Sequence, residues 1–163
     1  MDGHVFTLRD GTEADEPFFF RVFAENKARE FDALSLSGER LQPLLVMQYR
    51  ARCAGYVSSH PEARQLVIEV GHTPVGQILL SEGPSSIQIV DIAIVPKHQA
   101  RGLGTAVLIA MQARADSQAK KLRLQVVPHS PAHRLYDRLG FIVTASGTMS
   151  DEMVWTPRRA RTL

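Results

Sequence analysis

The sequence predicts a mixed α+β domain in which helices flank one sheet. Residues 64–95 hold three consecutive β-rich segments separated by short turns. Two segments before them and two after them have the apolar spacing and capping residues of helices. The expected order of elements is therefore βαα, βββ, α, β, α, ββ. A length of 163 residues suits one domain, expected over 1–157, with a basic and disordered tail at 158–163.

The N-terminal third predicts one strand and two helices. The alternating segment HVFTLRD, residues 4–10, is the first strand. Thr12 and the acidic residues around it indicate a helix N-terminus. The helix that follows carries four phenylalanines within residues 18–23, which we expect to pack in the core. A second helix is expected over Gly38 to Tyr56.

The remaining two thirds predict a sheet interrupted by two helices. Residues 64–70, 73–80 and 86–96 indicate an antiparallel meander, and Ile87–Val95 is so apolar that we expect a central strand covered on both faces. The later elements are a helix with apolar positions at Leu103, Val107, Leu108 and Met111, a strand at 121–127, a helix between Ser130 and Gly140, and a terminal hairpin.

Composition excludes several classes of protein. The single cysteine, Cys53, allows no internal disulfide and favours a reducing compartment. The polar N-terminus is unlike a signal peptide and no apolar run is long enough to span a membrane, so we expect a cytoplasmic protein. A net charge of +2 without basic–aromatic interleaving argues against nucleic acid, and no histidine spacing indicates a metal. A monomer and a homodimer are both compatible with the sequence.

The stretch VPKHQARGLGTAVL, residues 95–108, indicates a strand that enters a helix through a glycine turn. Free N–H groups and the helix dipole favour an anion at a helix N-terminus, and Gly102 and Gly104 would let a phosphate approach. Arg101 could add charge-assisted bonds. The alternative is that the glycines only permit a tight turn. No GK[ST] follows, and Val107 stands where a dinucleotide fingerprint has its third glycine.

Two motifs resemble the GNAT superfamily of N-acetyltransferases. The stretch VPKHQARGLGT resembles that family's Q/R-x-x-G-x-G/A acetyl-CoA motif, and SPAHRLYDRLGF resembles its NPAxxLYxxLGF segment. The similarity covers residues 64–155 well, and the chain looks closest to a bacterial subgroup with a VDIA central strand, whose substrate is unknown. The resemblance implies six to seven mostly antiparallel strands, about four helices, and a splay between the strands at 87–95 and 121–127.

The resemblance also implies where acetyl-CoA would bind. The splay would accept the pantetheine arm, paired with the backbone of one strand, where an N–H would hold the oxyanion. The pyrophosphate would lie on the glycine turn. Serine stands where the family often has an asparagine that contacts the arm. The residues concerned are Ile92, Ala93 and Ile94 for the arm, Gln99, Ala100, Arg101, Gly102, Leu103, Gly104 and Thr105 for the pyrophosphate, and Ser130.

Two catalytic residues are proposed on this basis. The resemblance assigns Tyr136 as the general acid that protonates the leaving thiolate. Asp91, inside an apolar strand, is a base with a perturbed pKa or, equally, a structural acceptor for a backbone group or an arginine. Glu69 and Glu30 are reserve candidates. The segment at 30–40, which roofs the acceptor cleft in this family, mixes acidic and basic residues and indicates no acceptor.

The expected function is therefore transfer of an acetyl group from acetyl-CoA to a primary amine of a small molecule or protein. The alternative is a non-catalytic module that binds or senses an acyl-CoA, because the base is unassigned and the asparagine is missing. A purely structural domain is a third interpretation.

Overall fold

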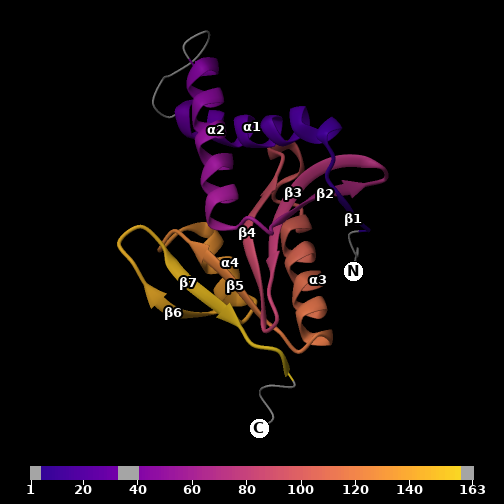
Figure 1. The fold of residues 1–163 in the computed structure, drawn as a ribbon, viewed down its shortest axis with the longest axis vertical. Coiled ribbons are helices and arrows are strands. Elements are labelled where there is room, and N and C mark those ends of the chain that lie inside the picture. The colour runs from indigo at the N-terminus through magenta and orange to yellow at the C-terminus, as the bar shows by residue number, and fades with distance from the viewer. Residues whose placement is uncertain (1–4, 33–40, 159–163) are drawn as a thin grey trace. The chain divides into compact units, whose positions relative to one another are not determined.

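The computed structural model describes residues 5–32 and 41–158 of the chain, and its elements follow the predicted order (Figure 1). The elements are β1 (Thr7–Asp10), the 3-10 turn η1 (Glu13–Asp15), α1 (Glu16–Asp32), α2 (Leu41–Ser59), β2 (Arg64–Val70), β3 (Thr73–Glu82), β4 (Ser86–Ile94), the 3-10 turn η3 (Pro96–His98), α3 (Leu103–Ser117), β5 (Lys121–Val126), α4 (Pro131–Arg138), β6 (Ile142–Ser146) and β7 (Asp151–Trp155). The α+β fold class is therefore confirmed.

The strands form a seven-stranded sheet in the order β1-β2-β3-β4-β5-β7-β6. Strand β4 is the middle strand, as expected. Its ladder with β5 is parallel, whereas β1–β2, β5–β7 and β6–β7 are antiparallel. The predicted burial on both faces is wrong for the second half of β4, because Asp91, Ile92 and Ala93 are half-exposed while Ile87 and Ile89 are buried.

The described chain divides into two compact units. Val5–Leu79 and Asp91–Arg101 make up the first, here called the N-unit, and Leu80–Val90 with residues 102–158 make up the described part of the second, the C-unit. Strands β3 and β4 each contribute residues to both units. The single domain expected over 1–157 stays a prediction, and of the expected tail only Arg158 lies within the described residues, where its backbone N–H donates to Asp116.

In the N-unit, α1 packs on α2, and the aromatic run of α1 is divided between the core and that contact (Figure 1). The expectation that all four phenylalanines are buried is wrong. Phe19 is buried, whereas Phe18, Phe20 and Phe23 are half-exposed. Neighbouring residues of a helix point about 100° apart, so a run of three cannot face one core. Phe20 and Phe23 instead pack on the ring of Tyr49 in α2, at centroid distances of 5.3 and 5.5 Å.

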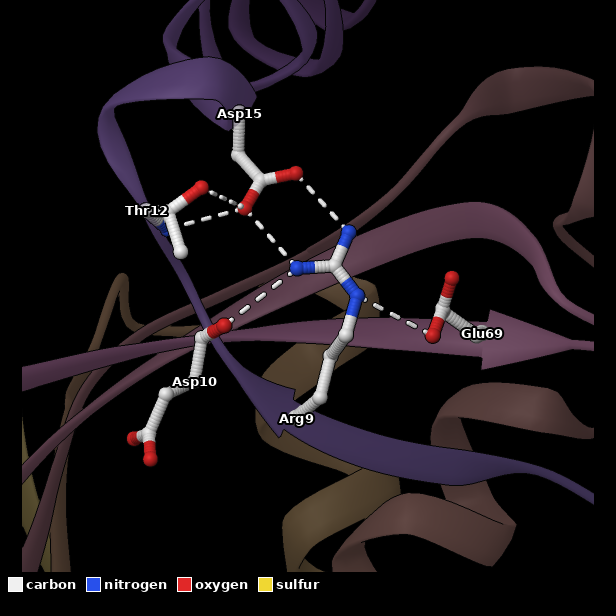
Figure 2. A network of polar contacts seen from close by, with 5 residues as sticks. All are labelled: Arg9, Asp10, Thr12, Asp15 and Glu69. Atoms are coloured by element: carbon white, nitrogen blue, oxygen red, sulfur yellow. Dashed lines mark hydrogen bonds and ion pairs between the residues drawn. The ribbon is translucent and has the colours of Figure 1, made fainter.

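An arginine-centred network joins β1, η1 and β2 within the N-unit (Figure 2). Arg9 donates two hydrogen bonds to the carboxylate of Asp15, both of 2.8 Å, and a third of 3.1 Å to Glu69. The backbone N–H of Thr12 also donates to Asp15, which confirms Thr12 at a helix N-terminus. The hydrogen bonds from Arg9, and then that from Thr12, hold the pKa of Asp15 well below its usual value. Glu69, a reserve candidate for the base, is therefore engaged in an ion pair.

In the C-unit, α3 buries one face and packs on β5. The four apolar positions predicted for this helix, Leu103, Val107, Leu108 and Met111, are all buried. Helix α4 begins as predicted, with the Ser130 side chain accepting a hydrogen bond from the backbone N–H of His133 and a proline at the first position. It ends before Gly140, which has φ of 92° as a glycine after a helix C-terminus often does.

Strands β6 and β7 form the predicted terminal hairpin. All five residues of β6 are exposed, and β6 lies at one edge of the sheet. Its pairing with β7 shifts register between Val143 and Ala145. Among the described residues, none of the helices combines the length and apolar character needed to cross a bilayer.

Candidate functional site

The glycine turn leads from the end of β4 to the start of α3. Ala100 and Gly102 both have left-handed backbone, with φ of 61° and 81°. The first bond of α3 runs from the N–H of Ala106 to the carbonyl of Gly102, so the preceding N–H groups open the helix, and the N-cap residue, Gly102, has no side chain to cap them. A Cβ atom on Gly104 would meet nothing within 4 Å. The left-handed conformation therefore favours glycine at position 102, whereas Gly104 leaves open space at the helix mouth.

The backbone at the end of β4 lies unusually close to β3. A Cβ atom on Gly76 would stand 2.6 Å from the carbonyl oxygen of Ala93 and 3.2 Å from the Cα atom of Ile94. The N–H of Val95 donates to the carbonyl of Val75 at 2.9 Å. The parallel ladder with β5 pairs Ser86–Ile89, in the first part of β4. The segment expected to face the pantetheine arm is therefore held from the β3 side.

The side chain of Gln99 is directed into the N-unit. Its Nε2 atom donates to the carbonyl of Ile94 and to Oδ1 of Asn26, both at 2.7 Å, and its Oε1 atom accepts from Arg29 at 3.0 Å. Asn26 donates to the same Ile94 carbonyl at 3.1 Å. Of the residues predicted for the cofactor, Gln99 and Ile94 thus contact one another directly.

Asp91 is paired with an arginine. Its two carboxylate oxygens accept from Arg52 at 2.8 Å and from Gln77 at 2.7 Å. The Arg52 guanidinium also lies over the rings of Phe23 and Tyr56, at 5.6 and 5.4 Å from their centroids. Burial, and then the charge of Asp91, raises the pKa of the Tyr56 hydroxyl. This geometry is that of the structural acceptor, and the role of base stays a prediction.

Tyr136 lies in α4 of the C-unit, and Ser130 is the N-cap residue of that helix. Tyr136 is buried, with 8% of the residue exposed, and its ring packs on Phe141 with centroids 5.6 Å apart. The Ser130 hydroxyl donates to the carbonyl of Val127 at 2.7 Å while it accepts from the N–H of His133. Because its only hydrogen is donated within the chain, Ser130 could serve a cofactor only as an acceptor.

The remaining candidates are the reserve base Glu30 and the acceptor segment. Glu30 forms an exposed ion pair with Lys27. The family's acceptor segment falls largely on residues 33–40, outside the described residues. An open hollow of about 510 Å³ lies along α2 and is lined by Gln42, Pro43, Val46, Met47 and Arg50, none of them a predicted site residue. No group of three or more metal-binding side chains lies together in the described part of the chain.

Two residues of this region were missed by the sequence reasoning. Asn26 follows Phe19 and Val22 on the buried stripe of α1, at the spacing i, i+3, i+7. A polar residue on an apolar stripe is a signal that the sequence does contain. Arg52 gave no comparable signal, because its partner Asp91 lies 39 residues further along the chain.

Comparison with known proteins identifies the family. A family model described as the acetyltransferase (GNAT) family matches residues 13–141. The chain belongs to this family. The matched region contains every residue predicted for the cofactor and both predicted catalytic residues. No curated protein matches the sequence.

Solved structures of the family share the fold. The PaiA N-acetyltransferase of Thermoplasma acidophilum, in complex with coenzyme A, superimposes with a TM-score of 0.70 at 16% identity, over 93% of this chain and 99% of that one. An acetyltransferase of Thermus thermophilus gives 0.68 at 22% identity, over 96% and 99%. A GNAT acetyltransferase of Elizabethkingia anophelis with acetyl-CoA bound gives 0.60 at 14% identity, over 96% and 99%.

Proposed function

We propose that this acetyltransferase is an acyl-CoA-dependent N-acetyltransferase that moves an acetyl group from acetyl-CoA to a primary amine. The observation that carries the proposal is the glycine turn at the mouth of α3, inside the region that the family model matches. Related folds with coenzyme A or acetyl-CoA bound support the same co-substrate. The acceptor amine belongs to a small molecule or to a protein.

The residues of the turn fit a pyrophosphate. The N-cap residue of α3 is Gly102, which offers no capping side chain to the opening N–H groups, and a Cβ atom on Gly104 would meet nothing within 4 Å. Arg101 is exposed and forms no ion pair with any described residue, so its guanidinium is available to a phosphate. The positive end of the helix dipole and the opening N–H groups are the features that bind anions at a helix N-terminus.

The chemistry assigned to the chain is proton transfer and orientation. Acetyl-CoA would supply the thioester, whose carbon–sulfur bond breaks as the new carbon–nitrogen bond forms. The phenol of Tyr136 would give its proton to the departing thiolate. A base must remove a proton from the amine, and Asp91, already paired with Arg52, would act only if that pair opens. We therefore propose Tyr136 as the acid and leave Asp91 as the candidate base. A cytoplasmic location also stays a proposal, based on the single cysteine.

The decisive experiment compares Tyr136→Phe with wild type for acetyl-CoA turnover across a panel of primary amines. Loss of a general acid lowers kcat by about 10²- to 10⁴-fold, whereas binding of coenzyme A should be retained. Tyr49→Phe is the matched control, because it removes the same phenol hydroxyl from a tyrosine that donates to Glu16 on α1. Equal turnover by Tyr136→Phe at every pH would contradict the acid assignment. Tight binding of coenzyme A without turnover of any amine would favour the non-catalytic alternative.

A further inference from the structure

The carbonyl of Ile94, the last residue of β4, accepts two side-chain amide hydrogen bonds. One comes from Gln99 at 2.7 Å, five residues further along the chain, and the other from Asn26 of α1 at 3.1 Å. A carbonyl oxygen has two lone pairs, so this one is saturated within the chain. It is therefore not available to a ligand, although Ile94 is one of the residues predicted to bond the pantetheine arm.

Asn26 is at the centre of this arrangement. Its amide nitrogen donates to the carbonyls of Ile94 and of Val22, which lies one turn earlier in α1, and its Oδ1 atom accepts from Gln99. A reversed amide would place oxygen against two carbonyl oxygens, so the network permits a single orientation. The bond to Val22 fixes the side chain on its own helix, and the other two hold the chain beyond β4 to that helix.

Every polar atom of the two amides is engaged. The four N–H bonds of Asn26 and Gln99 go to Val22, to Asn26 itself and twice to Ile94, and Arg29 donates to the remaining oxygen of Gln99. Fully satisfied networks of this kind are rigid and restrict a segment to one conformation. The segment restricted here ends immediately before the left-handed residues of the glycine turn.

We propose that Asn26 is a positioning residue for the cofactor turn: through Gln99 and the Ile94 carbonyl it holds the end of β4 and the turn in the conformation that binds coenzyme A. This inference rests on the proposed function. It also reassigns Gln99, whose side chain braces the turn instead of contacting the pyrophosphate. The free energy cost of ordering this segment is then met in the free protein and not on binding.

The test uses Asn26→Asp, which keeps the shape of the side chain but removes both N–H donors, and Asn26→Leu, which removes them without adding charge. The Kd for coenzyme A, measured by calorimetry on the full chain, should rise about tenfold, as expected for the loss of one or two net hydrogen bonds. The matched control is Gln112→Glu, which removes an amide donor from a backbone carbonyl, that of Leu139, in the C-unit. It should reduce stability without changing this Kd.

A second measurement needs no ligand. Amide hydrogen exchange in the peptide covering residues 95–101 should become faster in both Asn26 variants and stay unchanged in Gln112→Glu. If wild type binds coenzyme A, an unchanged Kd in the Asn26 variants would overturn the inference. Unchanged exchange of residues 95–101 in these variants would overturn it as well. Failure of the wild type itself to bind coenzyme A would instead overturn the proposed function, and the exchange result would still decide whether Asn26 holds the turn.

Discussion

The close approach of β3 to β4 makes Gly76 a sensitive position. Substitution Gly76→Ala would add a Cβ atom 2.6 Å from the carbonyl oxygen of Ala93, about 0.8 Å closer than ordinary van der Waals contact begins. A further contact, 3.2 Å to the Cα atom of Ile94, is also to backbone. Rotation of a side chain cannot relieve contacts of this kind. One of the two strands must move.

The size of the effect follows from two opposing terms. Overpacking of a closely packed site costs about 1–3 kcal/mol. Replacing glycine by alanine restricts the unfolded chain and returns about 0.4–1 kcal/mol. We expect a net loss of about 1–2 kcal/mol in the free energy of unfolding, or a melting temperature lower by about 3–6 °C. Because the displaced atoms belong to the segment proposed to bind the thioester, kcat/KM should fall by more than about tenfold.

Urea denaturation and acetyl-CoA kinetics measure the two effects. Gly55→Ala is the matched control: this glycine lies inside α2, and a Cβ atom there meets nothing within 4 Å. The control should be more stable than wild type by about 0.5–1 kcal/mol, with unchanged kinetics. If Gly76→Ala were as stable and as active as the control, β4 would tolerate displacement and the reasoning would be refuted.

Three further predictions concern the turn, Asp91 and the Arg9 network. Gly104→Ala should stabilise the free protein, since the added Cβ atom meets nothing within 4 Å. If a phosphate fills that space, the same variant should raise the Kd for coenzyme A, measured by calorimetry, by about tenfold or more. Unchanged binding would show that no phosphate lies beside Gly104. Asp91→Asn should lower the free energy of unfolding by about 1–2 kcal/mol through the loss of the Arg52 ion pair. A loss of kcat of about 10²-fold or more in the same variant would instead assign Asp91 as the base. Arg9 lowers the pKa of Asp15 in the folded state. The stability that the ionised Asp15 contributes is therefore present above pH of about 4 and declines as the pH falls below that value. Asp15→Asn should therefore be less stable than wild type at pH 7 and lose less stability between pH 5 and pH 2, as followed by thermal denaturation.

Features that depend on neighbouring residues were predicted well from the sequence. The start and end of α4 follow from Ser130 and Gly140, whose capping and left-handed conformations are local properties. The buried face of α3 follows from periodicity alone. The order of the elements then restricts the topology, because a parallel pair such as β4–β5 requires a crossover helix.

Features that depend on distant partners were not predictable in the same way. The side-chain amide of Gln99 can hydrogen-bond to a phosphate or to another amide of the protein, and the sequence does not distinguish the two. Its partner Asn26 lies 73 residues earlier. The carboxylate of Asp91 required a partner, and the sequence offered many arginines without distinguishing Arg52. Which donor meets which acceptor is decided by packing of α1 and α2, and the sequence specifies that packing only through an apolar stripe.

The irregular pairing of β6 has a consequence for behaviour at high concentration. A strand at the edge of a sheet presents unpaired backbone groups that another sheet edge could extend, which leads to aggregation. The register shift between Val143 and Ala145 interrupts that row of groups. Ile142 and Val143 in this edge strand are apolar and exposed. The irregularity thus opposes strand addition at the β6 edge of the sheet.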